Sequence, residues 1–318
     1  MPKVQAILEG ILKKDALTAS RLLRAVDDQD PKTIEILEKI YPERKPSQVI
    51  GLTGPPGVGK STLIDALVAK EREGGACVGV LAIDPSSPFT GGALLGDRIR
   101  MSRHASDPDV FIRSLASRGR MGGLSASLQD SLVVMQAMGY SPIFVETVGT
   151  GQDEVEVLRV SHTTLVVLAP GLGDSIQSLK AGIMEIADIY VVNKADKDSA
   201  RTLQSEIEDL IGMKAYAPED WQPRVILTSP AYDQGLKELQ EAIKAHWTYL
   251  NKAGRRRLKE EQIAKQLVIG RMQDKILHLL ETKLNHLLEG AWKDEILNPY
   301  TMSNKLFERF KQQVVDET

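Results

Sequence analysis

Short apolar runs alternate with amphipathic stretches through the middle of the chain. The runs are rich in β-branched residues and occupy Val49–Thr53, Val78–Ile83, Ile143–Glu146, Thr164–Leu168, Ile189–Asn193 and Val225–Thr228. Strands that are buried on both faces of a parallel sheet have this continuous apolar character. The alternation therefore predicts an α/β fold with a mostly parallel central sheet and helices on both faces. Ligand-binding groups are expected at the carboxyl ends of the strands.

The two ends of the chain have a different pattern, in which apolar residues recur at helical spacing. The N-terminal part predicts short helices, the last of which starts after Pro31, and we expect them to pack on the core. In the C-terminal part, an apolar face continues from Ile263 to Leu288. The sequence thus predicts three regions, namely an N-terminal helical extension (1–47), a core domain (48–250) and a C-terminal helical arm (251–318).

The apolar face of the arm must be buried against something. It either packs on the core of its own chain or joins two subunits, and we favour the second alternative, which predicts a homodimer. The basic residues Arg255–Arg257 at its start lack interleaved aromatic residues, so they indicate a solvated helix face and no nucleic-acid site.

Composition and charge narrow the class of protein. Of the 318 residues 42% are hydrophobic and 26% are charged, as is usual for soluble globular proteins. Basic and acidic residues number 40 and 43, and a net charge of −3 gives no field that would attract nucleic acid or a membrane surface. The single cysteine, Cys77, excludes internal disulfides and is expected to be a buried small residue. With no membrane-length apolar run and no targeting pattern, we expect a cytoplasmic protein.

The most specific motif is Gly54-Pro-Pro-Gly-Val-Gly-Lys-Ser, which matches G-x-x-x-x-G-K-[ST] between a predicted strand and a predicted helix. Its glycines allow backbone N–H groups to turn toward an anion. Lys60 places a positive charge beside the outer phosphates, and the Ser61 hydroxyl can ligate Mg²⁺. The positive end of the following helix points to the same place. The motif predicts a nucleoside triphosphate site formed by Gly57, Val58, Gly59, Lys60, Ser61 and Thr62.

A second motif, Asn193-Lys-Ala-Asp, follows the predicted strand Ile189–Asn193 and indicates that the base is guanine. The Asp196 carboxylate can accept two hydrogen bonds from the edge of guanine, whereas adenine would leave it badly paired. Asn193 would brace the loops, and the stem of Lys194 would cover the base. A backbone contact to the guanine carbonyl is expected from the end of the next strand, at Ser229, Pro230 and Ala231.

Two acidic residues follow strands on the phosphate side. Asp84 can reach Mg²⁺ or its water ligands, although Asp-Pro-Ser-Ser-Pro can also be simple turn chemistry. Glu146 precedes Gly149, which can approach the γ-phosphate. Gln152 does not directly follow Gly149, so the water-positioning geometry of Ras-like enzymes is not expected. Further along, Gln177 and Lys180 lie one turn apart on one face of a predicted helix.

Taken together, these segments resemble the MeaB/ArgK family of SIMIBI-class GTPases. The resemblance covers nearly the whole chain and is carried, in this order, by Gly54-Pro-Pro-Gly-Val-Gly-Lys-Ser-Thr, Ile83-Asp-Pro-Ser-Ser-Pro, Gly96-Asp-Arg-Ile-Arg-Met, Glu146-Thr-Val-Gly-Thr-Gly-Gln and Asn193-Lys-Ala-Asp. Members act as chaperones for adenosylcobalamin-dependent acyl-CoA mutases, especially methylmalonyl-CoA mutase. The resemblance implies a P-loop NTPase fold, a homodimer built by the C-terminal arm, and a mobile third switch holding Gln177 and Lys180. It further implies Mg²⁺ handling by Ser61, Asp84, Asp97 and Glu146.

The sequence therefore predicts a Mg²⁺-dependent GTPase that converts GTP to GDP and gates cofactor loading or protection of a cobalamin-dependent mutase. One alternative is a P-loop kinase or ATPase linked to amino-acid transport, against which the guanine motif argues. A second alternative is a metallochaperone GTPase. One cysteine and no His-rich tract make that alternative weaker.

Overall fold

The computed structural model describes residues 2–28, 30–85, 102–104, 106–117, 123–147, 157, 159–171, 186–291, 298, 300–301, 303–304 and 307–308. The chain divides into two compact units, Met1–Leu267 and Val268–Thr318. The first unit contains the sheet, and within its described part the main helices and strands are α1 (Pro2–Leu12), α2 (Ala16–Asp27), α3 (Lys32–Ile40), β1 (Val49–Thr53), α4 (Lys60–Glu73), β2 (Val78–Pro85), β3 (Val110–Ser117), α6 (Gly123–Met138), β4 (Ile143–Thr147), β5 (Thr163–Leu168), β6 (Ile189–Asn193), α9 (Ala200–Gly212), β7 (Arg224–Thr228) and α10 (Leu236–Leu250).

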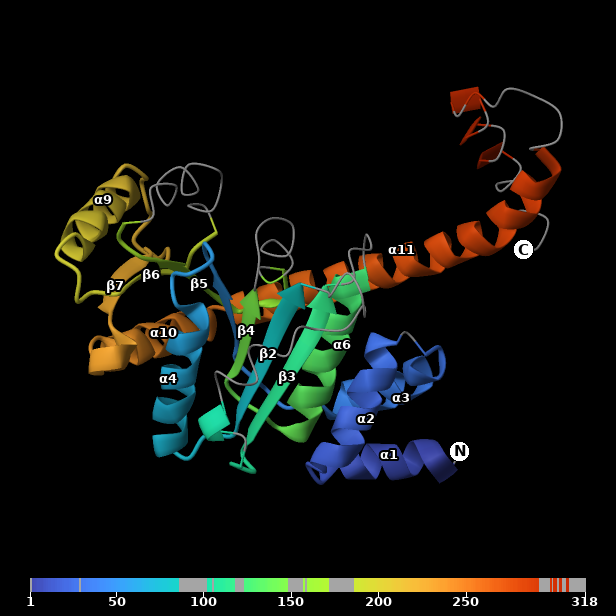
Figure 1. The fold of residues 1–318 in the computed structure, drawn as a ribbon, viewed down its shortest axis with the longest axis horizontal. Coiled ribbons are helices and arrows are strands. Elements are labelled where there is room, and N and C mark those ends of the chain that lie inside the picture. The colour runs from blue at the N-terminus through green and yellow to red at the C-terminus, as the bar shows by residue number, and fades with distance from the viewer. Residues whose placement is uncertain are drawn as a thin grey trace. The chain divides into compact units, whose positions relative to one another are not determined.

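The described strands form one seven-stranded sheet in the order β3-β2-β4-β1-β5-β6-β7, and every neighbouring pair is parallel (Figure 1). The six strands that the apolar runs predict are all present, and the predicted α/β class is confirmed. Because the strands are parallel, their carboxyl ends meet at one edge of the sheet. The β1 and β4 ends are adjacent there, and so are the β6 and β7 ends.

Helices cover both faces of the sheet. On one face, alternate side chains of β1, β2 and β4 pack under α6, and α9 packs on β5 and β6. On the other face, the intervening side chains pack against α4 and α10. Figure 1 shows α4 and α6 on the opposite sides of the strands. Two-sided burial explains why the strands lack the polar alternation of half-exposed sheets.

The three N-terminal helices pack outside α6, as expected from their apolar periodicity. Ile11, Leu23 and Ile40, one from each helix, are fully buried in the same cluster as α6. Asp15 caps α2 by accepting hydrogen bonds from the N–H groups of Leu17 and Thr18, and the bonds from the Thr18 hydroxyl and N–H lower the pKa of its carboxyl. The N-terminal region is thus a helical layer on the core.

The edge strand β3 was not predicted from the sequence. Its first three residues are strongly β-forming, but Arg113 and Ser114 interrupt the apolar run. Arg113 forms an ion pair with Asp27 of α2, so a charge in the middle of this strand is neutralised by a distant part of the chain. The run that begins at Val110, after Asp107-Pro108, is the signal that could have revealed it.

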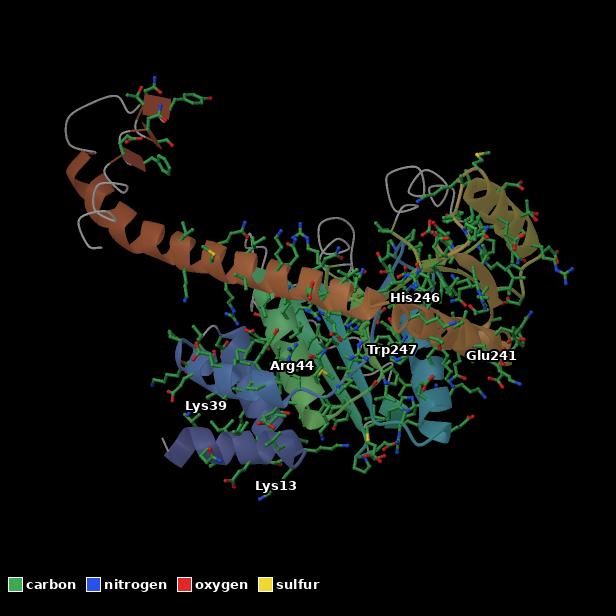
Figure 2. All side chains as sticks on the ribbon, turned by 180° about the vertical axis from the view of Figure 1, so that it is seen from behind. Lys13, Lys39, Arg44, Glu241, His246 and Trp247 are labelled. Atoms are coloured by element: carbon green, nitrogen blue, oxygen red, sulfur yellow. The ribbon has the colours of Figure 1, made fainter. Side chains whose placement is uncertain are left out.

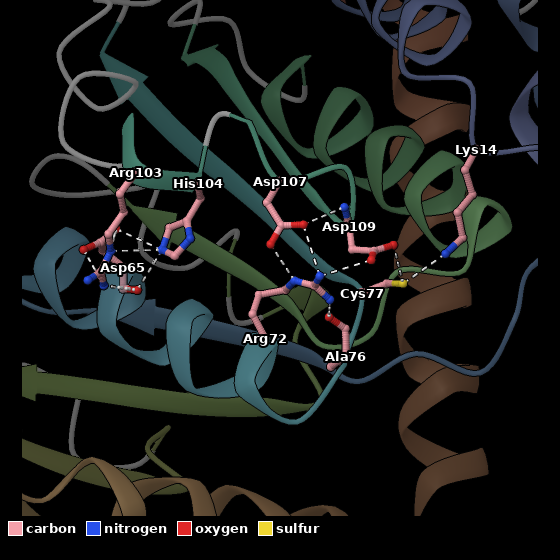
Figure 3. Close-up of polar contacts among 9 residues, drawn as sticks. All are labelled: Lys14, Asp65, Arg72, Ala76, Cys77, Arg103, His104, Asp107 and Asp109. Carbon is pink, nitrogen blue, oxygen red and sulfur yellow. Dashed lines mark hydrogen bonds and ion pairs between the residues drawn. The ribbon is translucent and has the colours of Figure 1, made fainter.

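A polar cluster joins α4, the start of β2 and the loop before β3 (Figure 3). The Arg72 guanidinium donates to Asp107 at 2.8 Å and to Asp109 at 3.1 Å, and the first of these bonds holds the pKa of Asp107 below its usual value. Cys77 is half-buried within this cluster, since its Sγ lies 3.0 Å from Lys14 Nζ and 3.3 Å from Asp109 Oδ1. Cys77 is thus only partly buried, whereas the sequence predicts a buried small residue.

A second buried polar cluster lies at the amino ends of the strands. His162 accepts a hydrogen bond at Nδ1 from the N–H of Val49 at 3.0 Å. His246 Nδ1 lies 2.9 Å from Thr163 Oγ1, and its Nε2 lies 3.3 Å from Asp188 Oδ1. Burial lowers the pKa of each histidine to about 4 and raises the pKa of Asp188 to about 6. Both histidines are therefore neutral at pH 7.

The helix α11 (Arg255–Ala291) follows α10, and its residues up to Leu267 belong to the first unit. Arg256 and Arg257 form ion pairs one turn along it, with Glu260 and Glu261, which agrees with the predicted solvated face. The second unit continues α11, where Val268 and Met272 are exposed. The domain boundaries predicted at 47 and 250 stay predictions.

We expect the variant His162→Asn to flatten the pH dependence of stability. The unfolded chain protonates His162 with a pKa near the ordinary 6.5, whereas the folded protein resists protonation down to about 4. The free energy of unfolding should therefore fall as the pH drops from 6.5 to 4, by up to about 3 kcal/mol for this residue. Asparagine can still accept from the Val49 N–H, so the hydrogen bond is kept while the titration is lost.

Urea unfolding of both proteins at several pH values measures this slope. Asp188 acts in the opposite direction, because its raised pKa favours folding at low pH, so the difference between variant and wild type is the informative quantity. An identical pH slope for the two proteins would contradict the assignment.

Candidate nucleotide-binding site

The phosphate loop leaves β1 at Gly54 and enters α4 at Lys60. Gly54 has φ 142°, and a Cβ there would lie 2.0 Å from the Val167 carbonyl oxygen of β5. Gly59 has φ 95°, and its Cβ would lie 2.6 Å from Asn193 Nδ2. Glycine is required at both positions by backbone conformation and by close packing. The loop is thus pressed against two neighbouring strand ends.

Side-chain amines and an amide bind the carbonyl groups of the loop. Lys60 Nζ donates to the Gly54 carbonyl at 2.6 Å and to the Pro55 carbonyl at 3.2 Å. Lys194 Nζ donates to the Gly57 carbonyl at 2.7 Å. Asn193 Nδ2 donates to the Val58 carbonyl at 2.8 Å. Four carbonyls are therefore directed at donors supplied by α4 and by the end of β6.

This arrangement determines which N–H groups remain for a ligand. In a trans peptide the N–H points away from the C=O of the same unit. The Gly57 carbonyl, which binds Lys194, shares its peptide unit with the N–H of Val58, and the Val58 carbonyl, which binds Asn193, shares its unit with the N–H of Gly59. These two N–H groups consequently point to the opposite side of the loop. Gly59 is the N-cap residue of α4 and offers no side chain to the first-turn N–H groups. Those N–H groups and the positive end of the helix suit an anion such as a phosphate.

An oxygen-rich pair lies at the start of α4. Ser61 Oγ donates to Glu146 Oε1 at 2.7 Å, and both residues are buried. Glu146 lies in β4, the neighbour of β1, with Leu52 as its register partner. A hydroxyl and a carboxylate are hard oxygen donors of the kind that Mg²⁺ prefers, so the residues present fit that ion.

The predicted base-binding residues meet at the ends of β6 and β7. Asn193 and Thr228 are register partners, and Thr228 Oγ1 donates to Asn193 Oδ1 at 3.1 Å. Ser229 Oγ donates to Asp196 Oδ1 at 2.7 Å. Asp196 itself is exposed, while Ser229 is buried. The bond orients one carboxylate oxygen and leaves the group accessible to a ligand. Pro230 and Ala231 follow in the short helix η4 (Pro230–Tyr232).

The structure brings together the loop residues 57–62, Glu146, and the pair of segments 193–196 and 228–231. The backbone of Asp84 lies at the carboxyl end of β2, beside β4. Asp97, Gln177 and Lys180 lie outside the described residues. Sequence reasoning missed Thr228 as a partner of Asn193, although its place at the end of the next predicted strand is a signal that could have found it.

Comparisons with known proteins agree with this geometry. Residues 19–285 match the family described as methylmalonyl Co-A mutase-associated GTPase MeaB. A Pyrococcus horikoshii protein that carries the name GTPase is 42% identical over 97% of this chain and 99% of its own length. The GTPase ArgK of Escherichia coli is 31% identical over 94% of each chain. The solved structure of a LAO/AO transport system kinase has a TM-score of 0.74 at 25% identity and covers 98% of both chains.

We expect Asn193→Ala to destabilise the protein by about 1–3 kcal/mol, because it leaves the Val58 carbonyl and the Thr228 hydroxyl without their partner. The same change should weaken GDP binding, since it removes one of the hydrogen bonds that hold the phosphate loop. Urea unfolding and GDP titration measure the two effects. Gln204→Ala is the matched control, since that amide bonds Glu208 on the surface of α9. Equal behaviour of the two variants would contradict the bracing role.

Proposed function

The chain belongs to the MeaB family of GTPases, and from this premise we propose that its GTP hydrolysis gates cofactor loading or protection of an adenosylcobalamin-dependent acyl-CoA mutase, with methylmalonyl-CoA mutase as the first candidate. The observation that carries this proposal is the family match over residues 19–285, whose description names association with that mutase. The geometry of the site supports the nucleotide chemistry on which such a gate depends.

The phosphate loop and Lys60 bind the phosphates in this proposal. The N–H groups of Val58, Gly59 and the first turn of α4 donate to the phosphate oxygens. Lys60 exchanges the Gly54 and Pro55 carbonyls for those oxygens and stabilises the charge that develops on the transferring phosphoryl group. The strand-end residues hold these donors in place, so little reorganisation is needed during the reaction.

Ser61, Glu146, Asp84 and Asp97 would hold Mg²⁺. When bound, that ion would supply positive charge that offsets the charge of the phosphate groups. The hydrogen bond between Ser61 and Glu146 orients two of the proposed oxygen donors, which supports their assignment. Asp84 is placed at the adjacent strand end by the pairing of β2 with β4.

Two features of the proposal rest on the sequence. The C-terminal arm joins two subunits, and the exposed apolar side chains of α11, such as Leu258 and Val268, support this. Turnover by the isolated protein is slow, because the candidate charges for the transition state, Arg98, Arg100 and Arg118, lie in loop-like segments of the sequence. Docking of the mutase would close these segments and move Gln177 and Lys180.

The two alternative functions are not favoured. The Asp196 carboxylate is exposed and is held by Ser229 at a strand end, where it suits guanine. A kinase that uses ATP does not need such a carboxylate. For a metallochaperone, the described residues contain no group of three or more His, Cys, Asp or Glu that could hold a metal ion.

Among the described residues there is also no helix long and apolar enough to cross a membrane.

We expect Asp196→Asn to weaken GDP binding by roughly 1–3 kcal/mol, or about five- to 150-fold in Kd, because the amide cannot accept both guanine hydrogen bonds. The same variant should bind xanthosine diphosphate more tightly, since its extra carbonyl can pair with an amide N–H. Titration with GDP, ADP and xanthosine diphosphate measures the change. Asp198→Asn, an exposed neighbour, is the control. Equal affinity of the wild type for GDP and ADP would contradict guanine recognition.

We expect an adenosylcobalamin-dependent mutase to accelerate GTP hydrolysis, and Lys180→Ala to reduce that acceleration. Positioning of one cation at the transition state can contribute on the order of 10³–10⁵ in rate. Single-turnover hydrolysis with and without methylmalonyl-CoA mutase measures the effect, and Lys13→Ala is the control for loss of an exposed lysine. Fast GTP hydrolysis by the isolated protein, at a rate that the mutase does not change, would contradict the proposed gating mechanism. Equal acceleration of Lys180→Ala would show that the third switch is elsewhere.

A further inference from the structure

A cavity lies at the amino edge of the sheet, away from the nucleotide site at the carboxyl edge. Its volume is about 470 Å³, within the range of roughly 300–1,000 Å³ that small-molecule sites have. Its walls come from the segment after α3, from α6, from the residues before β5 and from the first turns of α11, all within the unit Met1–Leu267. Figure 2 labels Arg44, one of these wall residues, on the face that the start of α11 crosses.

The inner wall of the cavity is apolar. Leu132, Val133 and Val160 are buried there. The α11 side chains opposite them, Ile263 and Leu267, are only half-buried, so this part of α11 covers the cavity without filling it. A cavity with such walls favours a ligand that has an apolar body.

Gln129 supplies an unsatisfied polar group to this wall. It is 4% exposed, and within the described part of the chain its Nε2 has no hydrogen-bond partner. Buried amides normally find partners, so this group is an exception that requires an explanation. Rotation about its last torsion exchanges the amide oxygen and nitrogen with little change in shape, so Gln129 can present N–H donors to the cavity.

The mouth of the cavity carries cationic side chains. Arg44 and Lys45 are exposed, and neither forms an ion pair within the described part of the chain. Arg44 stacks on the Tyr41 ring with its guanidinium carbon 3.5 Å from the centroid. On the α11 side, Glu260 and Glu261 are already paired with arginines one turn away. The mouth therefore has an excess of positive charge that suits a carboxylate.

The two polar features are separated along the cavity. The Lys45 N–H donates to the Gln136 carbonyl at 3.2 Å, which places Lys45 beside the end of α6. Gln129 lies seven residues before Gln136 and ten before Gly139, beside which the Lys45 Nζ lies, so the separation is about 10–15 Å at 1.5 Å per residue. A ligand that uses both features needs an anionic group and a second acceptor at about that separation.

We propose that this cavity binds a medium-chain monocarboxylate that carries a second hydrogen-bond acceptor near its far end. Its carboxylate lies at Lys45 and Arg44, its chain lies against Leu132 and Leu267, and its acceptor receives a hydrogen bond from Gln129. Because α11 forms one wall, the bound ligand fastens the start of this helix to the sheet domain.

Calorimetric titration of the full chain saturated with GDP, which keeps the nucleotide site filled, tests the proposal. The probes are monomethyl suberate, octanoate and octanol, which all have eight-carbon chains. Monomethyl suberate has both the carboxylate and the second acceptor, octanoate has the carboxylate alone, and octanol has a hydroxyl in place of the carboxylate. We expect one saturable site per chain for monomethyl suberate, about tenfold weaker binding of octanoate and no saturable binding of octanol. Absence of saturable binding by both carboxylates up to millimolar concentration would overturn the proposal, and octanol binding as tight as that of octanoate would overturn its anionic part.

Two variants locate the site. Lys45→Glu should weaken both carboxylates about tenfold, whereas the matched change Lys13→Glu, on an exposed lysine outside the cavity, should leave them unchanged. Gln129→Met should remove the preference for monomethyl suberate over octanoate without lowering the Tm, because it removes a buried Nε2 that has no hydrogen-bond partner among the described residues. Equal effects of the two lysine variants, or a retained preference in Gln129→Met, would contradict the assignment.

Discussion

The hydrogen bonds that hold the phosphate loop by its carbonyl groups are the interactions on which the site depends. A loop with three glycines has many accessible conformations, and only a few direct its N–H groups at one point. Donors from Lys60, Asn193 and Lys194 select one of these by occupying the carbonyls of Gly54, Pro55, Gly57 and Val58. Asn193 and Lys194 thus organise the anion-binding face from the opposite side of the loop.

This bracing joins the two halves of the nucleotide site. Asn193 and Lys194 belong to the same motif as Asp196, the residue proposed to bind the base, yet their side chains end on the phosphate loop. The chain can make these contacts only because the parallel sheet places the ends of β1, β5 and β6 side by side. Gly54 against the Val167 carbonyl shows how close that approach is, since no other residue leaves room there. Strand order therefore controls the shape of a loop that is itself only eight residues long in sequence.

The features that could be predicted from the sequence are those that a local segment encodes. The phosphate loop is one contiguous motif, and six strands are uninterrupted apolar runs, so both were within reach. The edge strand β3 was not, because Arg113 breaks its pattern and is neutralised by Asp27, 86 residues earlier. The sequence likewise predicts a bracing role for Asn193 but not its partners, since the pairing with Thr228 depends on which strands become neighbours. The unpaired Nε2 of Gln129, seen among the described residues, depends on which elements surround α6, and helical periodicity contains no information about that.

The hydrogen bonds of Lys60 and Ser61 also bear on how the site binds its ligand. Lys60 and Ser61 already have hydrogen-bond partners, so an incoming triphosphate replaces existing bonds and gains only the difference between the old and new ones. The replacement favours the nucleotide, because a phosphate oxygen is charged whereas the Gly54 carbonyl is neutral, and charge-assisted bonds are about twice as strong. Asn193 and Lys194 bind the loop carbonyls on the side away from the anion, so their hydrogen bonds can persist while Lys60 donates to phosphate oxygens.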